Sequence, residues 1–312
     1  MIKKVNFPEP KIIAVNNIEL EVFEAGEENR ERPIVLCHGW PEHAYSWRSQ
    51  IPALVAAGYH VIVPNQRGFG NSSCPSDTLA YDIDNLTKDL LGILDHYGYE
   101  KSIFMGHDWG SAVVWAMGLL HPERVVAQIN LALPYQERGE LPWVQMMEKF
   151  FGDEYYFVHF NKRPGVADKI LNENVEQFFT NLFRKNAPSP SLDTNMMIDL
   201  ATSNKAQGEA ILSAEELNIF ISAFEKTGFT PSINWYRNLD RNWHILGKVD
   251  SIIKHPVLMI YGQKDLIPKF ERISQYVPNI SETTIESGHW IQQECPDKTN
   301  KVILEWLEMN SR

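Results

Sequence analysis

Apolar residues recur along the chain in short, β-branched runs that alternate with segments of helical spacing. The continuous apolar runs lie at residues 33–37, 60–64, 102–105 and 125–133. Between them, residues 44–57 and 81–97 place apolar side chains at the spacing of an amphipathic helix. Residues 18–24 alternate apolar and polar positions, which is typical of an edge strand. Because continuous apolar runs fit strands buried on both faces, the pattern predicts a largely parallel sheet covered by helices.

The alternation stops at about residue 134 and resumes near residue 256. The intervening stretch contains helix-like segments at residues 173–184, 214–226 and 232–239, without strand–helix alternation. Strand patterns then return at 256–261 and 281–286, followed by a terminal helix at 297–308. The simplest interpretation is a helical block inserted into an α/β sheet. We therefore predict a core domain of residues 1–134 and 247–312, and a helical domain of residues 135–246 inserted into it.

Charge and composition narrow the class of partner. The 312 residues include 29 Lys and Arg against 40 Asp and Glu, so the formal net charge is 29 − 40 = −11. Neutralising nucleic-acid phosphates or binding an anionic membrane needs a surplus of basic residues, so neither partner is expected. No apolar run reaches the roughly 18 residues of a membrane-spanning helix. Residues 1–10 lack the apolar segment of a secretory signal, so we expect a cytoplasmic protein.

Cysteine usage predicts neither a disulfide framework nor a metal site. The three cysteines are Cys37, Cys74 and Cys295, and no two share a Cys-x-x-Cys spacing. Such an odd and sparse set is not typical of disulfide-rich or zinc-binding proteins. Cys37 lies within an apolar run, and we interpret it as a small core residue. We expect no metal ion and no cofactor.

The most informative motif is Gly106-His107-Asp108-Trp109-Gly110, between a predicted strand and an apolar helical stretch at residues 111–120. A nucleophile flanked by glycines at a strand-to-helix turn is presented above the sheet, because the tight turn leaves no room for a Cβ atom. The N-terminus of the following helix favours negative charge at that point. The alternative is an ordinary glycine-rich turn with a solvated aspartate. The pattern predicts that Asp108 is a nucleophile.

Two further residues follow in the chain order nucleophile, acid, histidine. Asp265 comes after the predicted strand at 256–261, and His289 comes after the predicted strand at 281–286. Each signal is weak alone, because an aspartate after a strand is often a helix cap and a lone histidine is often a satisfied polar residue. Since parallel strands end at the same edge of a sheet, we expect Asp108, Asp265 and His289 to converge there.

The turn after the first buried strand reads His-Gly-Trp-Pro at residues 38–41. In folds with a nucleophile at this kind of turn, that loop supplies one backbone N–H of the oxyanion hole, and the residue after the nucleophile supplies the other. The candidates are the N–H groups of Trp40 and Trp109. The proline offers a rigid turn, for which a cis bond is one route. We interpret the nearby histidines as structural hydrogen-bonding residues: His38, His43 and His107.

An aspartate nucleophile selects the reaction. Its carboxylate is already ionised and can attack a carbon electrophile to form an alkyl ester. His289, oriented by Asp265, would then activate the water that attacks the ester carbonyl. Such a nucleophile suits an sp³ carbon with a leaving group, as in an epoxide or a carbon–halogen bond. An alkoxide needs a proton donor whereas a halide does not, so phenols in the helical block decide between the two.

Longer motifs extend the pattern over almost the whole chain. They are His38-Gly-Trp-Pro-Glu42, Tyr45-Ser-Trp47-Arg48, Arg67-Gly-Phe-Gly-Asn-Ser72, Gly106-His-Asp-Trp-Gly110, Asn234-Trp-Tyr-Arg-Asn238 with Asn242-Trp243, Gly262 to Asp265, and Gly288-His-Trp290. With them the chain resembles the epoxide hydrolases of the α/β-hydrolase superfamily, particularly the soluble type of plants, vertebrates and bacteria. The resemblance implies an α/β-hydrolase fold, with a mostly parallel eight-stranded sheet flanked by helices and an inserted helical cap.

In that family two lid tyrosines hydrogen-bond the epoxide oxygen and protonate the opening alkoxide. The resemblance assigns one role to Tyr236, and the four-residue spacing before Phe160 selects Tyr156 over Tyr155 for the other. We interpret Tyr155 as a buried aromatic residue. A phenol near its ordinary pKa of about 10 stays protonated at neutral pH, as a donor must.

The chain departs from the family pattern at two places. The family usually has Phe-Gln-x-Pro-Gly after the first tyrosine, whereas this chain has Phe160-Asn-Lys-Arg-Pro164-Gly165, which is one residue longer. This departure bears on the choice of Tyr156. Asn65 stands where an aspartate is common, and we expect it to be structural.

Three alternative classes fit these motifs less well. Haloalkane dehalogenases carry Asn or Glu after His-Gly, where this chain has Trp40, and fluoroacetate-type dehalogenases carry Arg after the nucleophile, where it has Trp109. A non-catalytic binding protein of this fold often lacks a member of the triad, whereas all three are present. A serine esterase is disfavoured because Ser111 lies beyond the apex of the turn.

The expected partners are therefore a small apolar epoxide and water, with the chain a monomer or a homodimer. The sequence leaves the identity of the epoxide and the selectivity open. Six apolar residues of the helical block fit either its core or a pocket wall: Trp143, Met146, Met147, Phe178, Phe179 and Leu182.

Overall fold

The computed structural model describes residues 7–188 and 194–310, and its contacts divide the chain into two units. The first unit comprises residues 1–66, 86–136 and 249–312, and the second comprises residues 67–85 and 137–248. The segment relevant to a secretory signal lies partly outside the described residues, since these begin at residue 7.

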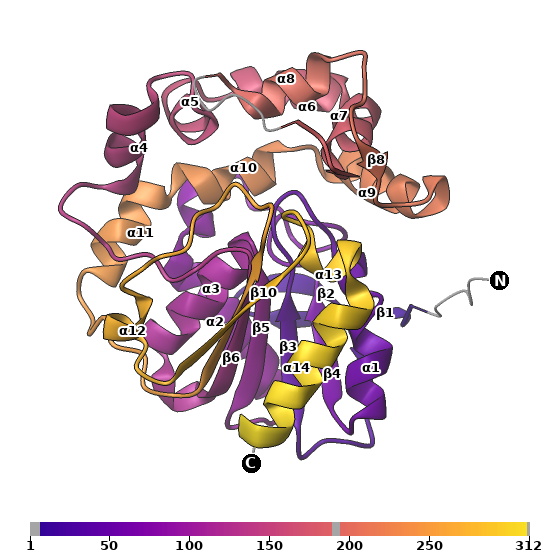
Figure 1. Ribbon diagram of the computed structural model, residues 1–312, viewed down its shortest axis with the longest axis vertical. Coiled ribbons are helices and arrows are strands. Elements are labelled where there is room, and N and C mark those ends of the chain that lie inside the picture. The colour runs from indigo at the N-terminus through magenta and orange to yellow at the C-terminus, as the bar shows by residue number, and fades with distance from the viewer. Residues whose placement is uncertain (1–6, 189–193, 311–312) are drawn as a thin grey trace. The chain divides into compact units, whose positions relative to one another are not determined.

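The first unit is built on an eight-stranded sheet with the order β1-β2-β4-β3-β5-β6-β9-β10. The strands that Figure 1 labels include β3, β5 and β6 at the centre of this sheet. The strands are β1 Pro10–Val15, β2 Ile18–Ala25, β3 Pro33–Cys37, β4 His60–Pro64, β5 Ser102–His107, β6 Val125–Leu131, β9 Val257–Gly262 and β10 Ile280–Ile285. β2 pairs antiparallel with β1 and β4, and the other neighbouring pairs are parallel. The prediction of a mostly parallel eight-stranded sheet is confirmed.

The edge of this sheet differs from the sequence-based expectation. Residues 18–24 do form a strand, but β1 lies outside it and is the true edge. Asn16 and Asn17 adopt positive φ angles of 44° and 61°, which matches the two-residue turn that joins β1 to β2. β1 was not predicted because its adjacent apolar residues 12–15 hide the alternation of a half-exposed strand.

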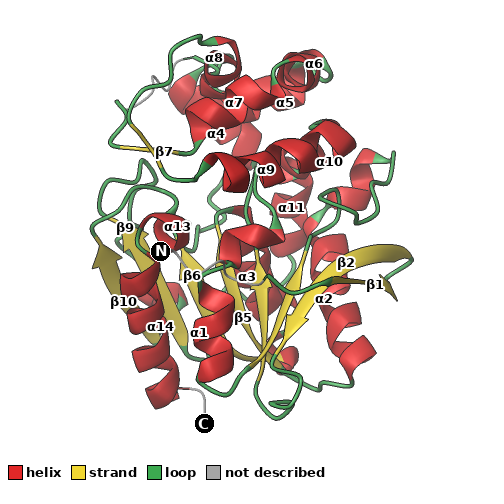
Figure 2. Cartoon of the chain, turned by 90° about the vertical axis from the view of Figure 1, so that its right-hand side faces the viewer, coloured by secondary structure: helices red, strands yellow, loops and turns green. Residues whose placement is uncertain are grey.

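Helices cover both faces of the sheet (Figures 1 and 2). They are α1 Gln50–Ala56, α2 Ile83–Tyr97, α3 Trp109–Leu120, α12 Ile273–Tyr276, α13 Ile291–Glu294 and α14 Pro296–Asn310, with 3-10 turns at Ala44–Trp47 and Pro122–Arg124. On one face, Leu54 of α1 and Trp306 of α14 share a buried cluster with Leu36 of β3. On the other, Trp115 of α3 packs with Met259 of β9. The layers confirm the predicted α/β-hydrolase fold class.

The second unit consists mainly of short helices. They are α4 Trp143–Phe151, α5 Tyr156–Lys162, α6 Val166–Glu173, α7 Val175–Leu182, α8 Met196–Thr202, α9 Ala214–Thr227, α10 Thr230–Arg237 and α11 Leu239–Leu246, with a 3-10 turn at Thr78–Tyr81 and a two-stranded ribbon of β7 Arg184–Lys185 and β8 Glu209–Ala210. The helix predicted at 232–239 is α10, which begins and ends two residues earlier, and the next helix, α11, begins at Leu239 after Asn238.

Residues 67–85, which the sequence analysis placed with the core domain, make their contacts within the second unit. The indole N–H of Trp235 donates to the Arg67 carbonyl at 3.0 Å, and the Asn238 amide donates to the Thr78 carbonyl at 2.7 Å. Hydrophobic periodicity could not detect this assignment, because the bonds join side chains to a distant backbone.

Phenylalanines form the centre of the second unit. Phe178 and Phe179 of α7 are fully buried and pack against Phe229, and Phe179 also packs against Phe224. For these two residues the core interpretation therefore applies. Within the described residues, no helix is long and apolar enough to cross a membrane.

Candidate active site

Asp108 occupies a strained turn between β5 and α3. Its φ and ψ angles are 51° and −121°, a conformation that non-glycine residues rarely adopt. A Cβ atom on Gly106 would lie 2.4 Å from the Gly110 backbone, and one on Gly110 would lie 2.0 Å from the Cys37 carbonyl oxygen. Both glycines are therefore required for the close approach of backbone segments that presents the carboxylate.

Three predicted residues of the first unit come together beside the ends of their strands. The Nδ1 atom of His289 lies 3.0 Å from Oδ2 of Asp265, which is hydrogen-bonding distance. The Nε2 atom on the other side of the ring lies 3.6 Å from Oδ2 of Asp108. The ring is thus held by one carboxylate and directed at the other, the orientation that a base acting beside Asp108 would need.

The predicted oxyanion loop also reaches Asp108. The backbone N–H of Trp40 donates to Oδ1 of Asp108 at 2.9 Å, and the peptide bond between Trp40 and Pro41 is cis. A Cβ atom on Gly39 would lie 2.6 Å from the Asp108 Cβ, so glycine is needed beside the carboxylate. Trp109 follows Asp108 as the first residue of α3 and is buried.

The charges of this cluster support one another. Burial alone would raise the pKa of the Asp108 carboxyl, but the hydrogen bond and charge of His289 outweigh burial and hold that pKa below its ordinary value. The pKa of Asp265 is lowered by the same balance. Burial opposes a charged His289, yet the two carboxylates raise its pKa well above the ordinary value. These shifts favour the charged forms of both carboxylates and of the His289 ring.

His107, which the sequence predicts to be a structural hydrogen-bonding residue, forms a buried pair with Glu42, for which the sequence predicts no role. Glu42 Oε2 lies 2.6 Å from His107 Nδ1 and also accepts the Gly39 N–H at 2.8 Å. The other ring nitrogen of His107 lies 2.8 Å from the His289 carbonyl oxygen. The pair thereby connects the oxyanion loop, the nucleophile turn and the His289 backbone. The glutamate of the His-Gly-x-Pro-Glu motif was the available signal.

The remaining residues that the sequence marked as structural do make structural contacts. His38 accepts the Gln66 N–H at 3.1 Å, and burial lowers the His38 pKa to about 4, so the ring is neutral. Burial likewise lowers the pKa of His43 to about 3. Asn65 accepts the Ala44 N–H at 2.7 Å, which ties the oxyanion loop to the end of β4.

The two predicted tyrosines lie together in the second unit. Tyr156 begins α5 and Tyr236 lies in α10, and their ring centroids are 5.7 Å apart. Tyr236 is only 2% exposed and also packs edge-on against Phe157 and Phe160. Tyr155 instead stacks on Phe151 with a centroid distance of 4.7 Å. Of the two candidates, Tyr156 is therefore the one whose ring contacts Tyr236.

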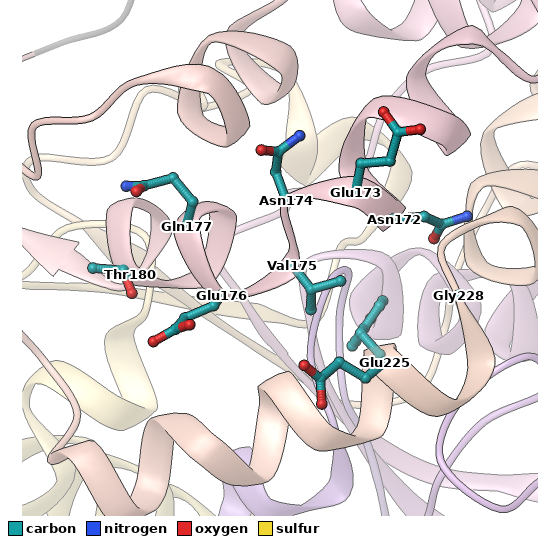
Figure 3. A pocket seen from close by; sticks show the side chains of 10 residues that line it. Asn172, Glu173, Asn174, Val175, Glu176, Gln177, Thr180, Glu225 and Gly228 are labelled. Carbon is teal, nitrogen blue, oxygen red and sulfur yellow. The ribbon is translucent and has the colours of Figure 1, made fainter.

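The second unit also contains an open hollow of about 820 Å³, shown in Figure 3. Its wall carries three carboxylates and three amides: Glu173, Glu176, Glu225, Asn172, Asn174 and Gln177. An apolar ligand there would desolvate charged groups without compensating bonds, which is unfavourable. None of the predicted site residues lines this hollow. Within residues 7–188 and 194–310, no cluster of three His, Cys, Asp or Glu residues could hold a metal ion.

The mostly parallel sheet and the aspartate at the turn after β5 define the class as α/β hydrolase. A family model described as alpha/beta hydrolase fold matches residues 32–296. Over 96% of its length the chain is 40% identical to epoxide hydrolase A of Mycobacterium tuberculosis, of which it covers 97%. The chain belongs to the epoxide hydrolases of the α/β-hydrolase fold family and is an enzyme of that type.

Two further comparisons agree with this assignment. The crystal structure of epoxide hydrolase A from Mycobacterium thermoresistibile superposes with a TM-score of 0.86 at 38% identity, covering 96% of this chain and 98% of that one. The bifunctional epoxide hydrolase 2 of Sus scrofa is 35% identical over 89% of this chain, which spans 52% of that relative's length.

Proposed function

We propose that this chain opens a small apolar epoxide to a vicinal diol through a covalent ester on Asp108. The observation that carries the proposal is the arrangement around that carboxylate. One oxygen accepts the Trp40 N–H at 2.9 Å, and the other lies 3.6 Å from His289 Nε2. An ionised carboxylate held in this way has one oxygen for attack and one in a site for an oxyanion.

In the first step, Oδ2 of Asp108 attacks an epoxide carbon and the carbon–oxygen bond of the ring breaks. The departing oxygen keeps the electron pair and takes a proton from Tyr156 or Tyr236. The two rings pack edge-on with their centroids 5.7 Å apart, which supports a shared role at one oxygen atom. This step leaves a neutral alkyl ester on Asp108 and a β-hydroxyl group on the substrate.

Formation of the ester changes the state of His289. The Asp108 charge is one of the influences that raise the His289 pKa, and esterification removes it. The pKa of His289 then falls, so the ring can release its proton, which passes through water to the tyrosinate left by the first step and restores the phenol. The neutral ring can then act as a base while Asp265 still holds Nδ1.

In the second step, His289 takes a proton from water, and the hydroxide attacks Cγ of Asp108. Negative charge develops on Oδ1, where the N–H groups of Trp40 and Trp109 would stabilise it. Losing one such donor typically costs on the order of 3 kcal/mol of transition-state stabilisation. Collapse of the intermediate releases the diol and restores the carboxylate.

Residues 135–246 would serve as the cap that supplies the phenols and excludes water. Tyr236 is surrounded by Phe157, Phe160 and Tyr156, which is a suitable environment for an uncharged, apolar substrate. Burying a charged substrate among these rings would cost several kcal/mol without a partner.

The test is a panel of epoxides and haloalkanes of matched carbon skeleton, with diol and halide measured separately. We expect diol from the epoxides and no halide above the Asp108→Ala blank, because phenols assist an alkoxide and not a halide. Asp153→Ala, an exposed carboxylate of the second unit, is the control that should retain activity. Halide release without diol formation would overturn the proposal.

A further inference from the structure

The helices that carry the two tyrosines are joined by reciprocal bonds from the side chains of one to the backbone of the other. The Asn161 amide of α5 donates to the Tyr236 carbonyl of α10 at 3.0 Å. The Arg237 guanidinium of α10 donates through Nε to the Phe160 carbonyl of α5 at 3.1 Å. Each bond thus ends at, or one helical turn from, a tyrosine of the pair, because Phe160 follows Tyr156 by four residues.

Arg237 is itself fixed. Its two terminal nitrogens lie 3.1 Å and 2.6 Å from the two carboxylate oxygens of Asp168 in α6, a bidentate pair whose side chains are 11% and 6% exposed. Burial by itself would raise the pKa of Asp168, but Arg237 outweighs it and keeps that pKa below the ordinary value. Arg237 also donates to the Asn234 side chain at 2.9 Å. Such a forked, partly buried pair fixes orientation as well as distance.

Asn161 is fixed from the other side. The same amide nitrogen donates to the Phe157 carbonyl of its own helix at 2.8 Å. Its two N–H groups therefore span α5 and α10. Asn161 stands where the longer segment of this chain departs from the Phe-Gln-x-Pro-Gly pattern noted above.

Neither helix can hold this geometry alone. α5 has seven residues and α10 has eight, which is below the length at which an isolated helix is stable. A misplacement of about 1 Å at a reacting group can cost on the order of 100-fold in rate. The bonds of Asn161 and Arg237 hold the backbone of the helices that carry the tyrosine pair. Their loss would therefore displace the phenol oxygens.

We propose that Asn161 and Arg237 are positioning residues for the proton-donating tyrosine pair. The inference rests on the proposed function, because it takes Tyr236 as a proton donor to the epoxide oxygen. Its signature is a selective loss of ring opening, since hydrolysis of the Asp108 ester uses His289 and does not need the phenols.

The test compares Asn161→Ala with Asn181→Ala by single-turnover kinetics that resolve ring opening from ester hydrolysis. Asn181 is a matched control in the same unit, because its amide also donates to two carbonyls, those of Leu200 at 2.7 Å and Ser203 at 2.8 Å. We expect Asn161→Ala to slow ring opening about tenfold and to change ester hydrolysis less than about twofold. Asn181→Ala should leave both steps within about twofold. Equal slowing of both steps by Asn161→Ala, or slowing of neither, would overturn the proposal.

A double-mutant cycle with Tyr236→Phe separates this proposal from the proposed function. If Asn161 acts through Tyr236, Asn161→Ala should slow ring opening less than about twofold in the Tyr236→Phe background. Independent, multiplicative losses would overturn the positioning role. If Tyr236→Phe alone leaves ring opening unchanged, the proposed proton donor fails instead, and the positioning role fails with it.

Should Asn161→Ala not fold, Arg237→Lys provides the same test. Lysine keeps the positive charge beside Asp168 but cannot make the forked contact together with the bond to Phe160. The expected result is again selective slowing of ring opening, and an unaltered ratio of the two rate constants would contradict the proposal.

Discussion

The two units hold their candidate residues by different means. Around Asp108 the backbone does the positioning, since Cβ atoms on Gly39 and Gly110 would meet neighbouring atoms at 2.6 Å and 2.0 Å. Around Tyr236 the side chains do it, through ring packing at 5.0 to 5.7 Å and bonds such as Asn161 to the Tyr236 carbonyl. Under the proposed mechanism, attack and oxyanion stabilisation would rest on a fixed backbone, whereas proton donation would rest on short helices held by side-chain contacts.

The units differ in charge as well. In the first unit, His289 lowers the pKa values of Asp108 and Asp265, and these two carboxylates raise the pKa of His289. The second presents phenols among aromatic rings, and burial raises the pKa of Tyr155 to about 12 despite a lowering contact from Tyr156. Under the proposed mechanism both units serve ring opening, whereas ester hydrolysis uses residues of the first unit alone. Substitutions of His289 and of Tyr236 should therefore affect different steps.

The largest effect should come from His289→Gln. Without a base the water cannot be activated, so ester hydrolysis should fall about 10³-fold while ring opening continues. Intact-mass spectrometry after mixing with epoxide should then show the enzyme enlarged by one substrate. His96→Gln, an exposed histidine of the first unit, is the control. If His289→Gln abolished ring opening and no adduct accumulated, the assignment of His289 to ester hydrolysis alone would be contradicted.

Tyr236→Phe should produce the opposite pattern. Removing one phenol should slow ring opening about 100-fold, because the remaining Tyr156 supports the alkoxide alone. Ester hydrolysis should be unchanged, and the two rate constants can be measured in one stopped-flow experiment. Tyr97→Phe is the matched control, since the Tyr97 hydroxyl donates to Glu24 at 3.0 Å within the first unit and lies outside the proposed pair. If Tyr155→Phe slowed ring opening more than Tyr236→Phe does, the second donor role would belong to Tyr155.

A smaller effect is expected from pH. The lowered pKa of Asp108 keeps its carboxylate ionised at pH 5, so ring opening should change little between pH 8 and pH 5. Ester hydrolysis needs neutral His289. Because carboxylates raise the pKa of His289, the neutral form and with it ester hydrolysis are lost as the pH falls. The ratio of hydrolysis to ring opening should therefore drop about tenfold per pH unit below the His289 pKa of the alkyl-enzyme.

A variant of Asp265 sharpens the pH experiment. Among the influences that raise the His289 pKa, the Asp265 charge is the largest, so Asp265→Asn should move the midpoint of the hydrolysis profile to lower pH. Parallel pH profiles of ring opening and hydrolysis in the unmodified enzyme would contradict the separate assignment of the two steps.

The sequence predicts the first unit well because the residues of its site lie in short local motifs. The glycines around Asp108 are required by backbone contacts, and the strand before Asp265, β9, is a continuous apolar run. What it missed there is non-local. The Glu42–His107 pair connects residues 65 positions apart at 2.6 Å, and no periodicity marks such a bond.

The second unit was predicted less completely for a related reason. Its short helices, such as α5 and α11, are stabilised by tertiary contacts more than by their own sequence, so their bounds are weakly encoded. The placement of residues 67–85 depends on side-chain bonds to distant carbonyls, such as that of Trp235 to Arg67. The contact between Tyr156 and Tyr236 joins residues of two helices and could be expected only from the family resemblance.

The covalent ester on Asp108 is the central claim, and isotope transfer tests it most directly. One turnover is run in water enriched in ¹⁸O with enzyme in excess over epoxide, and the diol and the peptide that contains Asp108 are analysed by mass spectrometry. We predict that the label enters the Asp108 carboxylate and is absent from the first diol, because water attacks the ester carbonyl. Label that appears at once in the diol, with none in the Asp108 peptide, would contradict the account.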